Sequence, residues 1–175
     1  KIKIPVFTGG PFSHDWAAQA FDTYNGVKGP KKILMVEPGT VDRPWKGQHE
    51  EMIRWFDHWL KGIDTGMMDE PPIKVFITGA NEWRNEKEWP LTRTQWTKFY
   101  LRSFKRLSLE PSDEDDQPDS FVQDPISQTS EVHSLKYTTP PMHKDTEFTG
   151  PISAYLYATI DQTDTNWHVI LRELD

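Results

Sequence analysis

Cysteine is absent from the 175 residues of this chain. Its absence excludes a disulfide framework, a zinc site built from thiolates and a cysteine nucleophile. Cysteine-free sequences suit a reducing compartment, so a cytoplasmic location is favoured.

Long apolar runs and an excess of positive charge are also missing. No apolar run approaches the roughly 18 residues of a membrane-spanning helix, and no signal-peptide pattern is present, so we expect a soluble chain without a membrane partner. Acidic residues outnumber basic ones by 27 to 20, which gives a net charge of −7. Without a basic stripe to contact phosphates, a nucleic-acid partner is not expected.

Aromatic residues are plentiful: they make up 13% of the chain, including eight Trp and nine Phe. Each buried ring removes a large apolar area from water, so a real core is expected despite the polar average. The chain opens "KIKIPVF", without Met and already inside a strand-like segment. We therefore expect it to be a piece of a longer protein.

The first 62 residues have a β-α-β-α pattern. Residues 4–8 are a short apolar run that predicts a buried strand, and residues 32–36, "KILMV", predict a second one. Apolar residues recur at helical spacing between Ser13 and Gly26, which predicts a helix there. Strands that alternate with helices predict a parallel sheet with helices on its faces. Two βα units leave both sheet edges open, so the rest of this sheet is expected outside the chain.

The clearest helix is "QHEEMIRWFDHWLKG", residues 48–62. One apolar stripe is expected to face the core; it consists of Met52, Ile53, Phe56, Trp59 and Leu60. The pairs Glu50/Arg54 and Asp57/Lys61 stand at i,i+4 spacing, and Gly62 is a natural stop.

After residue 72 the pattern becomes β-rich. The predicted strands are residues 73–78, 96–101, 134–139, 152–160 and 167–171. Proline-containing turns separate them, so we predict an antiparallel sandwich or jelly roll. The acidic stretch 110–120 lacks the spacing of a calcium loop and is expected to be a solvated loop. Trp83 and Trp89 are expected in an interface core rather than in a ring-binding platform.

The stretch "TGGPFSHDW", residues 8–16, could carry chemistry. Ser13 is a good helix N-cap and Asp15 suits the first helical turn, which together explain the stretch without catalysis. Its place after a parallel strand, however, is where α/β enzymes gather catalytic groups. No G-x-S-x-G motif occurs in the chain, so the nucleophile of a serine hydrolase of this fold would precede residue 1.

Two stretches carry a family resemblance. They are residues 54–101, "RWFDHWLKGIDTGMMDEPPIKVFITGANEWRNEKEWPLTRTQWTKFYL", and residues 146–171, "TEFTGPISAYLYATIDQTDTNWHVIL". Both resemble the cocaine-esterase-like (CocE/NonD) serine hydrolases, relatives of the X-prolyl dipeptidyl aminopeptidases. The resemblance implies the last two βα units of an α/β-hydrolase in residues 1–66. Residues 67–175 would then form an incomplete jelly-roll, galactose-binding-like domain.

The family's catalytic positions match imperfectly. The family's acid follows the first strand in a G-W-x-D arrangement, which puts Ser13 at that position. Its histidine follows the second strand in a G-P-W-x-H arrangement, which puts Val41 there. The resemblance therefore implies Asp15 as the shifted acid and His49 as the base, with Ser13 and His14 as alternatives. His58 is interpreted as structural.

The function implied is part of a serine hydrolase that cleaves ester or amide bonds, inactive as a fragment. No cofactor or metal is expected. The expected partners are a small ester or amide substrate and the missing N-terminal part of the same protein. Further copies of the protein, in a homo-oligomer, are also among the expected partners. There are two alternatives to a hydrolase function: a binding or structural module, and a family member that has lost its triad.

Overall fold

A computed structural model describes residues 2–12, 16–36, 48–125, 128 and 130–174. The chain divides into two compact units. The first comprises Lys1–Thr92 together with Gly150–Asp175, and the second comprises Arg93–Thr149. Each unit has a sheet of its own.

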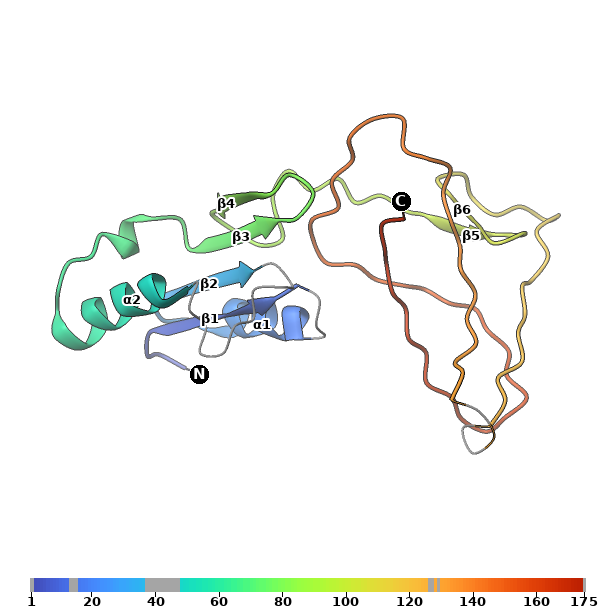
Figure 1. Cartoon of the computed structure of the whole chain (residues 1–175), viewed down its shortest axis with the longest axis horizontal. Helices are drawn as coiled ribbons and strands as arrows, with labels where there is room; N and C mark the ends of the chain where they lie inside the picture. Colours follow the sequence, from blue (N-terminus) through green and yellow to red (C-terminus); the bar gives the residue numbers. More distant parts are fainter. Residues whose placement is uncertain (1, 13–15, 37–47, 126–127, 129, 175) are drawn as a thin grey trace. The chain divides into compact units, whose positions relative to one another are not determined.

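The first unit contains a four-stranded sheet (Figure 1). Its order follows the chain: β1 (Val6–Pro11), β2 (Lys31–Val36), β3 (Ile73–Ile77) and β4 (Glu82–Glu86). β1 pairs with β2 in parallel, as the sequence predicted. β3 also pairs with β2 in parallel and forms an antiparallel hairpin with β4. The strand predicted at residues 73–78 is present as β3, but it pairs with β2 in the first sheet instead of standing in a sheet of its own. The domain boundary at residue 66 stays a prediction.

Helices cover both faces of this sheet. α1 (Trp16–Gly26) packs Phe21 and Tyr24 against the face that presents Ile33 and Met35 of β2. Side chains alternate along a strand, so Lys32 and its neighbour at position 34 face the opposite side. α2 (His49–Lys61) and the short 3₁₀ helix η3 (Met67–Asp69) lie on that side. There Trp55 of α2 stacks on Phe7 of β1, with ring centroids 5.5 Å apart.

The helix α2 ends as predicted but turns a different side toward the sheet. Gly62 adopts a left-handed conformation with φ of 69°, and its N–H donates to the His58 carbonyl. The buried residue of α2 is Trp55. The predicted core stripe is wrong, because Ile53, Phe56 and Leu60 are exposed. The spacing of apolar residues shows which side chains share one face of a helix. It does not show whether the sheet covers that face.

The two tryptophans of the hairpin region differ in their environment. Trp89 stacks face to face on Phe21, with centroids 4.0 Å apart, and packs partly buried against the core of the first unit. Its place in an interface core stays a prediction. Trp83 is 48% exposed and lies edge-on to Phe76, so its expected place in an interface core is not found in the described part of the chain.

The second unit is built on a hairpin of β5 (Tyr100–Arg102) and β6 (Arg106–Ser108). The strand predicted at 96–101 therefore begins only at Tyr100. The strand predicted at 134–139 is wrong apart from one bridge, between Thr138 and Arg106.

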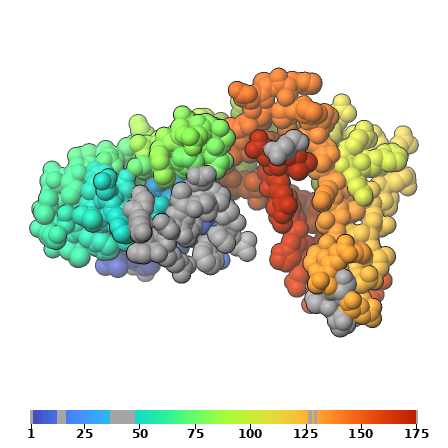
Figure 2. Space-filling view, viewed as in Figure 1, coloured from blue at the N-terminus to red at the C-terminus, as the bar shows by residue number. Residues whose placement is uncertain are grey.

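The C-terminal residues form no strand within the described part of the chain, so the strands predicted at 152–160 and 167–171 are wrong there. Both segments are exposed along their whole length; they are coloured orange-red to red in Figure 2. Tyr155 and Tyr157 are 87% and 105% exposed. A strand requires hydrogen-bonding partners as well as the right residues, and no described segment pairs with these.

Candidate functional site

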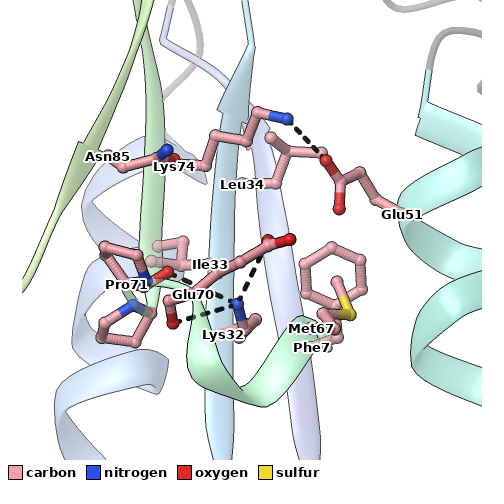
Figure 3. Close-up of a pocket in the computed structure, with 11 residues that line it drawn as sticks. Phe7, Lys32, Ile33, Leu34, Glu51, Met67, Glu70, Pro71, Lys74 and Asn85 are labelled. Atoms are coloured by element: carbon pink, nitrogen blue, oxygen red, sulfur yellow. Dashed lines mark hydrogen bonds and ion pairs between the residues drawn. The ribbon is translucent and has the colours of Figure 1, made fainter. Parts of the chain in front are cut away.

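A small cavity lies between β2, β3, η3 and α2 in the first unit (Figure 3). Its walls include the side chains of Phe7, Lys32, Glu51, Glu70 and Lys74. The volume is about 10 Å³, which is room for about one water molecule. Pockets that bind organic ligands enclose about 300 Å³ or more, so this cavity is not a substrate site.

Charged side chains from three elements meet around the cavity. Glu51 of α2 accepts from the Lys74 amino group of β3 at 2.5 Å and pairs with Arg54 at 3.4 Å. Arg54 also pairs with Glu70, whose other carboxylate oxygen lies 3.7 Å from the Lys32 amino group. The chain of contacts runs Lys74–Glu51–Arg54–Glu70–Lys32. It ties the helix to the two central strands.

The most buried member of this network is Lys32. Its side chain is only 6% exposed, and its amino group donates to the carbonyls of Glu70 and Pro71 at 3.3 and 3.4 Å. Burial lowers the pKa of Lys32, while the negative charge of Glu70 opposes that shift. The hydrogen bond from Arg54 lowers the pKa of Glu70. These contacts satisfy the charges internally, so the network holds α2 in place rather than catalysing a reaction.

The sequence did not reveal this network. The predicted partner of Arg54 was Glu50 at i,i+4, whereas the structure pairs Arg54 with Glu51 and Glu70. The other predicted pair, Asp57 and Lys61, forms at 2.6 Å. One signal was available: a lysine inside the buried run "KKILMV" requires a buried partner for its charge.

The predicted catalytic residues fall in two places. Ser13, His14 and Asp15 lie outside the described residues. His49 is the first residue of α2 and its side chain is exposed.

The strand ends that precede these residues are adjacent. Pro11 and Val36 are partners at the ends of the parallel strands β1 and β2. The Phe12 N–H donates to the Val36 carbonyl at 3.3 Å. The crossover between the parallel strands β2 and β3 requires α2 to run opposite to them, so the helix begins at their carboxyl edge. The ends of β1 and β2 and the start of α2 at His49 therefore lie at one edge of the sheet.

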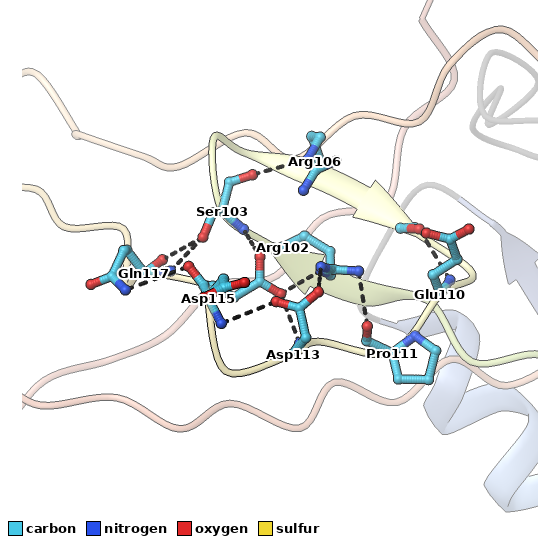
Figure 4. Close-up of polar contacts among 10 residues, drawn as sticks. Arg102, Ser103, Arg106, Glu110, Pro111, Asp113, Asp115 and Gln117 are labelled. Atoms are coloured by element: carbon cyan, nitrogen blue, oxygen red, sulfur yellow. Dashed lines mark hydrogen bonds and ion pairs between the residues drawn. The ribbon is translucent and has the colours of Figure 1, made fainter.

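The second unit contains a polar cluster around Arg102 (Figure 4). Arg102 pairs with Asp113 at 2.5 Å, binds Asp116 through Nε and donates to the Pro111 carbonyl at 2.9 Å. The Ser103 hydroxyl donates to the Gln117 carbonyl at 3.1 Å. The acidic stretch 110–120 was expected to be only a solvated loop. The stretch is exposed as expected apart from Asp116 and Asp119. The Asp116 side chain is only 11% exposed, because the buried Arg102 of β5 holds it.

The carboxyl of Asp116 is strongly perturbed. Burial raises its pKa, but N–H donors from Ser103 and Asp113 and the Arg102 guanidinium lower it more, from 3.8 to about 2. The lowered pKa means that Asp116 stabilises the cluster fully above about pH 4. That contribution is lost as the pH falls through about 2.

An NMR titration of the Asp116 carboxyl is therefore expected to give a midpoint near pH 2, with the loop 110–117 loosening as the group protonates. Replacement of Arg102 by Met removes one donor and the nearby positive charge, so it should move the midpoint upward toward 3.8. A wild-type midpoint near pH 4 would contradict this interpretation of the cluster.

The described residues contain neither a cluster of metal ligands nor a helix fit to span a membrane. No group of three or more His, Asp or Glu side chains there could hold a metal ion. No helix in that part of the chain is long and apolar enough to cross a membrane.

Comparison with known proteins identifies similar sequences. Residues 65–175 match the family described as "X-Pro dipeptidyl-peptidase C-terminal non-catalytic domain". A Mycobacterium bovis protein named "Putative serine esterase" is 27% identical over 158 residues, which cover 77% of this chain and 25% of that protein. The cocaine esterase of a Rhodococcus species is 40% identical over 47 residues, or 27% of this chain and 8% of that enzyme.

A solved structure shares the fold. The crystal structure of a CocE/NonD family hydrolase from Staphylococcus aureus matches 62% of this chain and 21% of its own, with a TM-score of 0.53 and 19% identity. These comparisons confirm the resemblance drawn from residues 54–101 and 146–171. The chain spans only about a quarter of the length of the Mycobacterium relative.

Proposed function

This chain belongs to the family of the X-Pro dipeptidyl-peptidase C-terminal non-catalytic domain, and we propose that it is the C-terminal part of a serine hydrolase that cleaves ester or amide bonds. The esterase names of its relatives support a hydrolase. Since no G-x-S-x-G motif occurs among the 175 residues, the nucleophilic serine belongs to the part of the protein that precedes residue 1.

The proposed division assigns residues 1–66 to the hydrolase domain and residues 67–175 to the jelly roll. The start of the family match at residue 65 supports a boundary in this region. With this division, the β3–β4 hairpin belongs to the jelly-roll part of the sequence but adds two strands to the sheet of the hydrolase part. We propose that the unpaired segments near the C-terminus pair with further strands of the jelly roll. The cytoplasmic location stays a prediction from the sequence.

The observation that carries the catalytic proposal is the adjacency of the β1 and β2 ends at Pro11 and Val36. In an α/β-hydrolase the acid and the histidine occupy loops at this edge. We assign Asp15 as the acid and His49 as the base, with Ser13 and His14 as the alternatives to them.

The proposed reaction is acyl transfer. The serine Oγ attacks the carbonyl carbon while the His49 imidazole accepts its proton, and the same proton then passes to the departing alcohol or amine. The Asp15 carboxylate orients the imidazole and stabilises its positive form. Water then repeats the attack on the acyl-enzyme and regenerates the serine. The chain by itself would hold only the acid and the base of the triad. Without a nucleophile and an oxyanion hole, it is expected to be inactive.

A second candidate is a family member with a degenerate triad, which would act as a binding or structural protein. Two observations favour it: Ser13 and Val41 stand where the family pattern places the acid and the histidine. The exposed position of His49 adds to them.

A fluorophosphonate probe applied to the intact protein tests the choice. The hydrolase proposal expects one serine to be labelled, because the probe reacts with an activated serine hydroxyl. A folded protein without a labelled serine would favour the degenerate triad.

A further inference from the structure

The first turn of α2 has no side-chain cap in the described part of the chain. The N-cap residue Gln48 has φ of −115° and ψ of 7°, outside the usual cap conformation, and its side chain makes no cap hydrogen bond. The first N–H groups of a helix have no partner within the helix, so an uncapped first turn frays easily. This turn begins with His49, the proposed base. A base at this position requires another contact that fixes the turn.

Glu51, in the same turn, is held by the sheet. Its Oε1 accepts a hydrogen bond from the Lys74 amino group of β3 at 2.5 Å, and the Glu51 side chain is only 16% exposed. Figure 3 shows Lys74 reaching from the strand toward Glu51. A charge-assisted hydrogen bond that is partly sheltered from water is stronger than an ion pair at an open surface. This contact therefore ties the start of α2 to β3.

Lys74 is itself positioned by the neighbouring strand. Its amino group lies 5.3 Å from the centre of the Trp83 ring of β4. Trp83 is the register partner of Phe76, and the two rings meet edge to face with centroids 5.2 Å apart. A cation near an aromatic face is attracted to the ring, so Trp83 restricts where the flexible lysine side chain can point. This contact gives the half-exposed Trp83 a role outside an interface core.

We propose that Lys74 is a positioning residue of the hydrolase: through Glu51 it fixes the first turn of α2, and with that turn the base His49. The inference rests on the proposed function and on the assignment of His49. Lys74 lies within residues 65–175, the part of the chain that matches the non-catalytic domain family. That part would then affect the rate of the reaction without supplying a group that reacts.

Other contacts hold α2 further along the helix. Trp55 stacks on Phe7, and Arg54 donates to the Thr65 carbonyl at 3.1 Å. Both residues lie more than one turn beyond His49, and their contacts do not involve Lys74. Replacement of Lys74 is therefore expected to loosen the first turn while the rest of the helix stays on the sheet.

Lys74→Met, made in the intact protein, removes the charge and keeps most of the side-chain length. We expect kcat for a small ester to fall on the order of 10-fold with KM nearly unchanged, because a misplaced base slows proton transfer without weakening substrate binding. Lys74→Arg keeps the charge and should retain most of the activity. Unchanged kcat in Lys74→Met would overturn the inference.

Lys61→Met is the matched control. Lys61 pairs with Asp57 of the same helix at 2.6 Å, so the change also removes an ion pair from α2, but in its last turn. Its kcat should stay within about twofold of the wild type, since exposed ion pairs contribute little. An equal fall in kcat for Lys61→Met and Lys74→Met would overturn the inference, because it would assign the effect to the helix as a whole.

Two further measurements separate positioning from damage to the fold. A fluorophosphonate should label Lys74→Met to the same final extent as the wild type, but more slowly. Fewer labelled sites with an unchanged rate per site would overturn the inference. Glu51→Gln should also lower kcat, and the double variant should be no slower than the slower single one, because both changes break the same contact. Additive losses would show that the two residues act separately.

Amide hydrogen exchange tests the contact without relying on activity. In an α-helix the Ile53 N–H donates to the His49 carbonyl, so its exchange reports on the first turn. We expect exchange on the order of 10-fold faster in Lys74→Met than in the wild type, and no change in Lys61→Met. Unchanged exchange in Lys74→Met would refute this inference alone, even where a serine is labelled. Faster exchange in a protein without a labelled serine would refute the hydrolase, and with it the catalytic effect of the contact.

Discussion

Replacing His49 with alanine is expected to lower kcat/KM of the intact protein for a small ester by about 10⁴-fold or more. The proposed base takes the proton of the serine hydroxyl, and no water molecule can replace an imidazole held in position. KM should change little, because His49 acts on the transferring proton rather than on substrate binding. Initial rates over a range of concentrations of a nitrophenyl ester separate the two constants.

The matched control is His58→Ala on the same helix. His58 lies edge-on to Trp59, with centroids 4.9 Å apart, and is interpreted as structural. Its removal should leave kcat within about threefold of the wild type, since it takes no part in the proposed proton transfer. Equal losses in both variants would show that the helix tolerates neither change and would remove the assignment of His49. Full activity of His49→Ala would remove it as well.

Gly9→Ala is expected to lower the free energy of unfolding by about 3 kcal/mol. An ideal Cβ at Gly9 would lie 2.0 Å from the Leu34 carbonyl oxygen of the neighbouring strand. Both groups belong to the paired backbones of β1 and β2, so neither can rotate away. The strands must separate to admit a methyl group, and the core that α1 makes with the sheet would be disturbed. Urea unfolding followed by tryptophan fluorescence measures the change.

Gly10→Ala is the control, one residue along the same strand. A Cβ at Gly10 meets nothing within 4 Å, so the substitution should change the free energy of unfolding by less than about 1 kcal/mol. A similar loss for both variants would mean that the close approach of β1 to β2 at Gly9 is not what requires glycine there.

The regular elements of the first unit were predictable because their signals are local. Residues 33–36 form a continuous apolar run between Lys32 and Glu37, and β2 spans them together with Lys31 and Lys32. Gly62 was expected to stop the second helix, and it does so with a left-handed conformation that glycine adopts without strain.

The failures share a physical cause, which is that burial depends on partners far away in the sequence. Ile53, Phe56 and Leu60 form a stripe in the sequence, yet Trp55 is the residue that packs on the sheet. Residues 152–160 have strand composition, but no described segment supplies hydrogen bonds to them. Composition therefore predicted a strand, but the described part of the chain lacks the neighbouring strand that it would pair with.

The candidate site was the least predictable part. The pairing of Pro11 with Val36 confirms the parallel arrangement that was predicted for the first two strands. The buried network was missed, because the partners of Lys32 and Arg54 come together only in the folded chain: Glu70 lies 38 residues beyond Lys32 and 16 beyond Arg54. Ser13, His14 and Asp15 lie outside the described residues, so their catalytic roles stay predictions.

The most direct measurement is to map the site that a fluorophosphonate labels in the intact protein. Proteolysis and mass spectrometry after labelling should find the probe on a single serine that precedes residue 1, within a G-x-S-x-G sequence. Denatured protein serves as the control and should carry no probe. A probe attached to a serine within residues 1–175, or a folded protein that takes up none, would contradict the account.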